Sequence, residues 1–178
     1  MTSSIDVEKK IYTWLDEVVI AENFCPFAKS VRVNQQIHLR ISKAQSTLRA
    51  VDEIMEECDQ LSSMPSRETT LVAFAEGFYD FDGYLGLLEE VEHVANIQGF
   101  EGIFQFASFH PQYQFEGESV DCVSNYTNRA PYPIVHILRE ATITKALSHF
   151  PNAESIPERN IKHANALGIG FFEQYLKT

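Results

Sequence analysis

The chain has 178 residues, of which 44% are hydrophobic and 22% are charged. This balance excludes wholesale disorder, collagen-like repeats and a disulfide scaffold, and the length predicts a single domain over residues 1–178. The 14 Lys and Arg against 25 Asp and Glu give a formal net charge of −11, which disfavours nucleic acid and anionic membrane surfaces as partners.

The sequence contains no targeting or metal-binding pattern. The N-terminal residues lack the basic start and apolar run of a signal peptide, and no apolar stretch is long enough to cross a bilayer. A cytoplasmic location is therefore expected. Cys25, Cys58 and Cys122 are odd in number and form no CxxC pair, which predicts reduced thiols rather than a disulfide framework or a zinc ribbon.

The first predicted element is a helix over about residues 4–23. Ser3 or Ser4 can cap this helix, and its apolar side chains recur at helical spacing, namely Ile11, Trp14, Leu15, Val18 and Val19. Residues 24–28 contain Pro26 and are predicted to form a compact apolar turn beside the core.

Two further helices are predicted in the first hundred residues. A capping-box pattern that starts at Ser42 precedes apolar residues at helical spacing, which predicts a helix over about 43–61. The next helix is expected to begin after a cap at Asp80 or Asp82 and to end at Gly99, where glycine accommodates a left-handed backbone.

Three strands are predicted to alternate with these helices. Residues 36–41 alternate apolar with polar side chains, whereas residues 69–74 and 102–107 are short apolar runs. Strand, helix, strand, helix, strand is the order of right-handed crossovers, and it predicts an α/β fold. The expected fold is a helix-covered, largely parallel three- or four-stranded sheet with additional C-terminal helices, and a ferredoxin-like α+β arrangement is the alternative.

The second half of the chain begins with an irregular segment. Residues 108–132 show no periodicity, and a stretch of this length inside a compact domain is expected to be a functional loop. Beyond it, a short helix is predicted from Pro133 and another over 142–149. A capping-box pattern at Ser155 predicts a last helix that Gly168 kinks or ends.

A histidine at the end of the third predicted strand is the first candidate for chemistry. His110 follows that strand directly, at the sheet edge where open α/β folds bind ligands. A neutral imidazole there can serve as general acid, general base or metal ligand. The alternative is that His110 only caps the strand end through a hydrogen bond.

The predicted loop concentrates short hydrogen-bonding side chains that suit a pocket lining. We predict that the planar fork of Arg129 holds an anionic substrate group, that Asp121 orients a partner and that Asn128 donates to developing charge. Asn125 and Tyr132 complete the predicted lining. The alternatives are an internal ion pair for Arg129 and turn roles for both asparagines.

The predicted helix after the loop adds a second histidine. His136 and Arg139 would share a helix face, and both are predicted to bind substrate. A buried His136 that is satisfied by a backbone carbonyl is the alternative. His110, His136 and Asp121 suit zinc or iron chemically, but the close spacings that mark metal sites are absent, so no metal is predicted and no cofactor is identified.

One cysteine has two interpretations. Cys25 is either a nucleophile with a histidine of the loop as its base, or a small buried apolar residue between aromatic neighbours.

Five segments together resemble the bacterial family catalogued as domain of unknown function 1415, and they are Phe24–Ala28, Asp80–Tyr84, Gln105–Pro111, Asn125–Pro133 and His136–Glu140. Ala130 stands where the family pattern is expected to carry serine. The resemblance implies a stand-alone cytosolic bacterial protein with no agreed activity. It also supports the view that residues 105–140 form one site.

The leading expectation is a small-molecule enzyme, a hydrolase or transferase, that acts on an anionic metabolite in a pocket formed by residues 105–140. A non-catalytic metabolite-binding or regulatory module with the same lining is the alternative. A third interpretation makes the polar cluster a structural clamp that holds the long loop against the domain. The sequence defines no oligomeric state.

Overall fold

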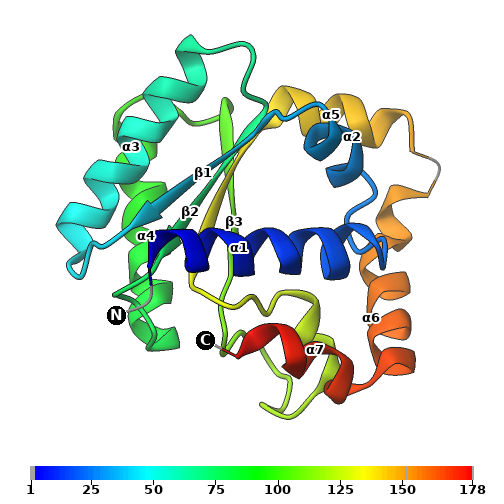
Figure 1. Ribbon diagram of the computed structural model, residues 1–178. Helices are drawn as coiled ribbons and strands as arrows, with labels where there is room; N and C mark the ends of the chain where they lie inside the picture. Colours follow the sequence, from blue (N-terminus) through cyan, green and yellow to red (C-terminus); the bar gives the residue numbers. More distant parts are fainter. Residues whose placement is uncertain (1–2, 151, 178) are drawn as a thin grey trace.

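The computed structural model describes residues 3–150 and 152–177 (Figure 1). Within this part the strands are β1 (Ile37–Ser42), β2 (Thr69–Phe74), β3 (Phe104–Phe109) and β4 (Ile134–Arg139). The α-helices are α1 (Ser4–Trp14), α2 (Ala28–Val33), α3 (Thr47–Ser63), α4 (Phe81–Ile97), α5 (Glu140–Ser148), α6 (Ile156–Leu167) and α7 (Ile169–Leu176). A π-helix, η1 (Leu15–Ile20), continues α1, and two 3₁₀ segments are η2 (Val123–Thr127) and η3 (Ala153–Ser155).

The four strands form one mixed sheet in the order β1-β2-β4-β3. β1 and β2 pair in parallel, and β4 pairs antiparallel with both of its neighbours. The three predicted strands therefore all run in the same direction, as their helical crossovers require. The expectation of a largely parallel sheet is nevertheless wrong, because β4 lies between β2 and β3 and runs the opposite way.

The error arises from residues 134–139, which were predicted as a helix and form the central strand β4. Ile134, Val135 and Ile137 are fully buried, and strands on both sides supply hydrogen-bonding partners to the backbone. A short apolar run has no periodicity that separates a buried strand from a buried helix. The predicted shared helix face of His136 and Arg139 is therefore also wrong, since residues three apart in a strand lie on opposite faces.

The helix caps predicted from the sequence are confirmed for α4 but not for α3. Asp80 caps α4 as predicted, with its Oδ2 accepting from the amide of Gly83 at 2.8 Å, and Gly99 follows the helix with a φ of +82°. By contrast, α3 is capped by Ser46 instead of Ser42, and its first turn starts later than expected. The short helix α2 was not predicted.

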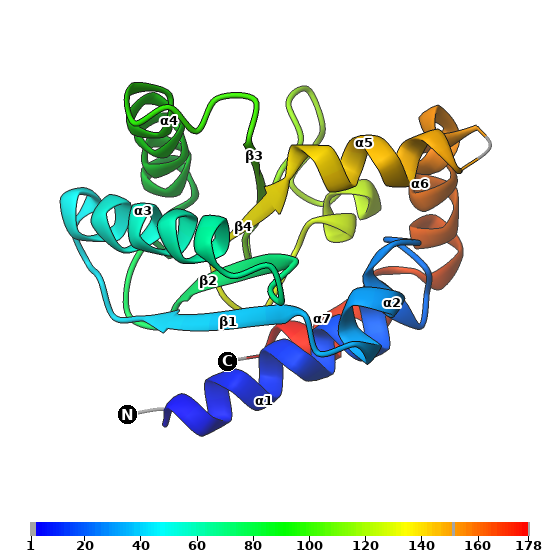
Figure 2. The same cartoon turned by 90° about the horizontal axis from the view of Figure 1, so that it is seen from above.

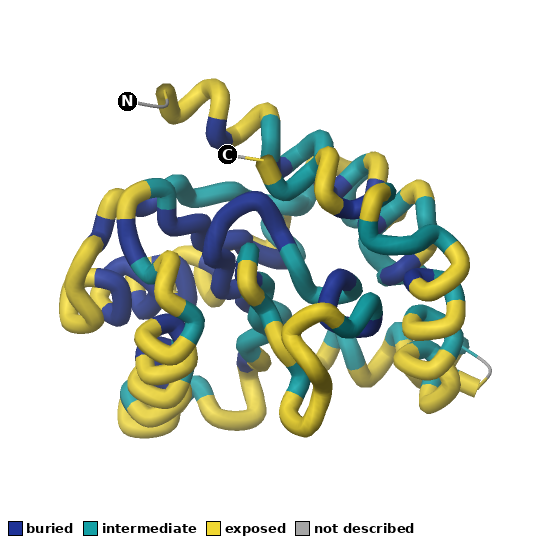
Figure 3. The backbone as a smooth tube through the Cα atoms, turned by 90° about the horizontal axis from the view of Figure 1, so that it is seen from below, coloured by how far each residue is buried: buried dark blue, intermediate teal, exposed yellow. Residues whose placement is uncertain are grey.

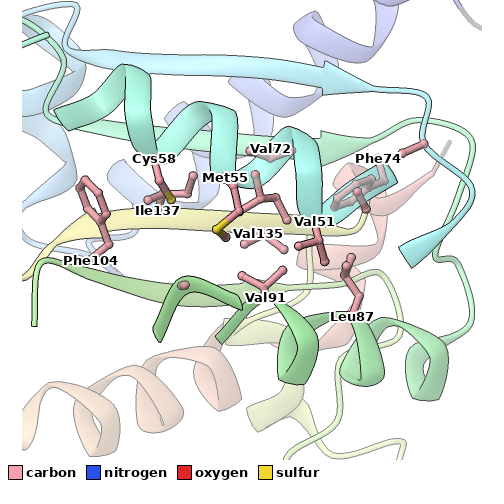
Figure 4. Packing of buried hydrophobic residues seen from close by; sticks show 14 of the residues in the cluster. Val51, Met55, Cys58, Val72, Phe74, Leu87, Val91, Phe104, Val135 and Ile137 are labelled. Atoms are coloured by element: carbon pink, nitrogen blue, oxygen red, sulfur yellow. The ribbon is translucent and has the colours of Figure 1, made fainter. Parts of the chain in front are cut away.

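Helices cover both faces of the sheet (Figure 2). α3 and α4 pack on one face, where apolar side chains of both helices meet those of β2, β3 and β4 (Figure 4). The other face carries α1, η2, α6 and α7, with a second apolar cluster beneath them. Buried backbone is concentrated in the central strands, and the outer surfaces of the helices are exposed (Figure 3).

The three cysteines are free thiols, of which Cys58 is fully buried and Cys25 and Cys122 are partly exposed. No helix in the described residues combines the length and apolar character needed to span a membrane.

Candidate functional site

A cavity of about 360 Å³ lies between the second face of the sheet and the helices around it. This volume is at the lower end of the range of about 300–1,000 Å³ that is usual for small-molecule sites. The sheet forms the floor, with side chains from all four strands, and α1, η1, α2 and α5 form the walls. The lining is mostly apolar and includes Trp14, Leu15, Val19, Phe27, Ala28, Val31, Leu71, Ala107, Phe109, Leu138, Ile143 and Ala146.

Two features of the backbone help to create this hollow. The strand register places Ala107 of β3 and Leu71 of β2 on either side of His136, so a small side chain borders the histidine on one flank. The π-helix η1 contributes Leu15 and Val19 to the wall. Short π-helical segments occur frequently at functional sites, and the sequence predicted an unbroken α-helix here.

His136 is the polar group at the floor of the cavity, and its hydrogen bonds define its tautomer. The hydroxyl of Thr69 donates to the carbonyl oxygen of Ile137 at 2.6 Å. The same oxygen lies 2.7 Å from Nε2 of His136. Because a hydroxyl carries one proton and a carbonyl cannot donate, Nε2 must carry the proton and donate to Thr69.

The second nitrogen of this ring, Nδ1, is therefore an acceptor with a lone pair. No side chain or backbone group in the described residues donates to Nδ1. Nδ1 is also not one of the fully buried side-chain atoms that lack a partner, so its surface is not completely covered by protein. His136 is partly exposed and lines the cavity, so Nδ1 is accessible there. Burial of the ring lowers the pKa of His136 to about 4, so the imidazole is neutral near pH 7.

The other polar side chains of the lining are mostly engaged with the protein itself. Thr142 donates a hydrogen bond to the carboxylate of Glu68. The guanidinium of Arg139 donates to three carbonyls at and beyond the end of α3, those of Leu61, Met64 and Arg67. Cys25 also lines the cavity, and it is partly exposed rather than buried.

His110 lies outside this lining and is fully buried. Its Nδ1 accepts from the amide of Gln112 at 3.0 Å, so its Nε2 donates to the carbonyl of Phe78 at 2.9 Å. The ring also packs against Phe81 and Tyr84. Both nitrogens are occupied, and burial lowers the pKa of His110, which corresponds to the strand-end hydrogen-bonding interpretation.

Arg129 and the asparagines of the loop also bind backbone groups. Arg129 donates to the carbonyls of Tyr113 and Val120, and its guanidinium lies 4.2 Å from the centre of the Tyr126 ring. The fully buried Asn125 binds the Phe115 amide and the Ser119 and Val120 carbonyls, whereas Asn128 donates to the Ser108 carbonyl. These contacts hold residues 108–132 against the domain.

The two remaining predicted residues also lie outside the lining of the cavity. Asp121 is exposed, and Tyr132 is buried with a hydroxyl that has no hydrogen-bond partner in the described residues. Of the eight predicted site residues, the structure brings only His136 and Arg139 to the cavity. Within the described residues, no group of three or more His, Cys, Asp or Glu side chains is arranged to hold a metal ion.

Most residues of the lining were not predicted as site residues. Trp14, one of the apolar residues at helical spacing in the first predicted helix, is buried and also forms part of the cavity wall. Thr69 was part of a β-branched run, and no sequence signal links it to a histidine 67 residues away. Besides His136 and Arg139, Cys25 is the residue of this lining for which the sequence indicated possible chemistry.

Comparison with known proteins yields a family and no individual relative. Neither a search of the curated proteins nor a search of the solved structures finds a match. The family model described as "Protein of unknown function (DUF1415)" matches residues 6–174, which is nearly the whole chain. This match confirms the resemblance carried by the five sequence segments, and the chain belongs to the DUF1415 family of proteins of unknown function.

Proposed function

We propose that this protein binds a small, neutral, largely apolar molecule that carries one hydroxyl or amide N–H donor. The observation that carries the proposal is the cavity with His136 at its floor. The ligand's apolar body occupies the space between the sheet and α1, α2 and α5, and its donor binds the lone pair on Nδ1. A few placed polar groups in an apolar pocket are the usual design of small-molecule sites.

A neutral ligand fits the lining better than the anionic metabolite expected from the sequence. Arg139 already donates to three carbonyls, and Glu68 adds a carboxylate to the same wall. His136 is uncharged near pH 7 and supplies an acceptor rather than a donor. An anion would therefore find no free cation among these groups and would lose its hydration.

The proposal is tested with two probes of nearly equal shape, menthol and menthone. Menthol can donate to Nδ1, whereas its ketone cannot. The only tryptophan, Trp14, lines the cavity, so its fluorescence reports binding, and neither probe has an aromatic ring that interferes. We expect menthol to bind about tenfold more tightly, the equivalent of one hydrogen bond of about 1.4 kcal/mol.

Two pairs of variants locate the binding site. His136→Leu should remove the preference for menthol, whereas His149→Leu, at an exposed histidine, should keep it. Ala107→Leu should fill part of the cavity and weaken binding of both probes, and the exposed Ala141→Leu should not. Binding that is equal for the two probes, or unaffected by Ala107→Leu, would contradict the proposal.

A second candidate function is thiol-dependent hydrolysis or acyl transfer, because Cys25 and His136 line one cavity. In this scheme the sulfur attacks an ester carbonyl while the thiol proton passes by way of Nδ1 of His136 to the departing alcohol, and water or a second alcohol then takes the acyl group from the sulfur and restores the thiol. Incubation with p-nitrophenyl acetate should then acetylate Cys25, as peptide mass spectrometry would show. Cys25→Ser should abolish nitrophenol release and Cys122→Ser should not. Equal rates in both variants would exclude this function.

A further inference from the structure

We infer that residues 25–34, which include α2, form a hinged lid over the cavity and that Arg32 is its latch. This inference rests on the proposed function, because a lid matters only if the cavity takes up a ligand.

The segment is set apart from the elements on either side of it. Asn23 and Gln35 flank it, and both have a φ of +56°, the left-handed conformation in which helices commonly end. No residue of α2 is buried, although Ala28 and Val31 line the cavity. Cys25 and Ala28 pack against the second apolar cluster but are only partly buried, so the segment has less apolar contact to hold it than a helix that buries whole side chains.

The N-terminal end of the segment is anchored, which places the hinge after residue 24. Arg159 of α6 donates to the carbonyl of Asn23 at 2.6 Å, and Asn160 donates to the carbonyl of Phe24 at 2.7 Å. α6 therefore holds the chain immediately before the segment.

The amide of Cys25 donates to the carbonyl of Val19 at 3.3 Å and belongs to the anchored end, and two side-chain contacts hold the rest of the lid closed. Arg32 forms a bidentate ion pair with Asp16 of η1, at 2.9 Å and 3.0 Å, and its guanidinium lies 4.2 Å from the centre of the Tyr12 ring. At the other side, the ring of Phe27 meets that of Phe150, beyond α5, edge to face with centres 5.6 Å apart. α2 and α5 both line the cavity, and this ring contact links the chain just before α2 to the chain just beyond α5.

The lid can be tested without a ligand, because Trp14 is only 2% exposed and lines the cavity behind α2. Acrylamide quenching of its fluorescence therefore reports opening. Arg32→Gln removes the ion pair, and we expect the fraction of molecules with an open lid to rise about threefold. The part of the quenching constant that exceeds the value for a fully shielded tryptophan should rise by the same factor. Lys29→Gln removes an exposed charge from the same helix and should leave quenching unchanged.

Amide hydrogen exchange separates lid opening from general destabilisation. In Arg32→Gln the amides of residues 28–33 should exchange about threefold faster, while those of α4 keep the wild-type rate. Phe27→Ala should produce the same local pattern by removing the second contact. Unchanged quenching and unchanged exchange in both variants would overturn the lid, as would equal acceleration in α4.

The outcome is independent of the menthol experiment. If neither probe binds but residues 28–33 open in Arg32→Gln, the lid stands and the proposed ligand class fails. If menthol binds through His136 while quenching and exchange do not respond to Arg32→Gln, the binding site stands and the lid fails.

Discussion

Two histidines of this protein differ in what their ring nitrogens contact. His110 has a hydrogen-bond partner on each nitrogen and packs between aromatic rings, which makes it a structural residue. His136 has a partner on Nε2 only, and its second nitrogen opens into a cavity. The availability of a lone pair, rather than proximity to a strand end, distinguishes the candidate binding residue from the structural one.

The low pKa of His136 predicts a pH-dependent stability. Its pKa is about 4 in the folded chain and close to 6.5 in an unfolded one, so the unfolded state binds more protons between these values. The free energy of unfolding should therefore fall as the pH drops from 6.5 towards 4. The expected contribution of this one group between pH 7 and pH 4.5 is about 2–3 kcal/mol.

Urea unfolding at the two pH values measures this effect. His136→Leu should lose the contribution of this group to the slope. His110 and His38, whose pKa values are also lowered by burial, contribute in the same direction and leave a residual slope in this variant. The explanation fails if His136→Leu and the wild type have the same slope.

The loop residues predict a stability effect without a binding effect. Asn125 is fully buried and binds one amide and two carbonyls of its own loop. Asn125→Ala should lower the free energy of unfolding by about 2 kcal/mol, because buried backbone groups lose their partners. The exposed Gln112→Ala in the same loop serves as the control. A loss of menthol affinity in folded Asn125→Ala would instead assign this loop to the binding site.

At the residue scale, the sequence shows which side chains have suitable chemistry, but it does not show which groups surround each of them in the fold. His136 was a candidate because imidazole titrates near working pH, and it does reach the cavity. Arg129 was a candidate because it forms a fork of donors, but the fork is used by the carbonyls of Tyr113 and Val120. Hydrogen bonds between distant backbone and side-chain groups decide which polar residue remains free, and no local pattern encodes them.

At the element scale, the fold was predictable where the signals are local. The strand over residues 69–74 was predicted with its observed bounds, and the cap at Asp80 was found. The strand β4 was not found, because neighbours on both sides bury it and remove the alternation that marks a half-exposed strand. The sheet was predicted to be largely parallel because this one antiparallel strand was assigned to a helix.

The contact between α4 and β4 gives a test of the observed strand. The hydroxyl of Tyr84, a fully buried residue of α4, donates to the carbonyl of Ile134 at 2.6 Å. Tyr84→Phe should lower the free energy of unfolding by about 1 kcal/mol while the ring packing is kept. Urea unfolding of Tyr84→Phe beside Tyr79→Phe, whose exposed hydroxyl donates to the carbonyl of Ala75 at 2.8 Å, measures how much more the buried bond contributes than an exposed one. Equal stability of Tyr84→Phe and the wild type would contradict this buried bond.

At the scale of the whole molecule, the net charge of −11 works against the compact state through self-repulsion. The exposed surface of α4 carries three neighbouring acidic residues, Glu89, Glu90 and Glu92. Added salt screens such repulsion within a Debye length of about 10 Å at 0.1 M.

Thermal unfolding should therefore depend on salt. We expect the melting midpoint to rise between about 10 mM and 100 mM NaCl, as the Debye length falls from about 30 Å to 10 Å. The triple variant Glu89→Gln, Glu90→Gln and Glu92→Gln should melt higher than the wild type at low salt and show a smaller salt effect. A midpoint that falls as salt is added would show that the ion pairs around β1, such as that between Arg40 and Glu57, outweigh the repulsion.

The position of β4 also has a consequence for synthesis on the ribosome. β2 and β3 are not neighbours in the sheet, and the strand that joins them comes after both in the chain. Until residues 134–139 have emerged, a nascent chain can pair β1 with β2 but leaves the facing edges of β2 and β3 without partners. Such edges attract other strands, so the interval between translation of β2 and of β4 is when this protein is most exposed to aggregation and most dependent on chaperones.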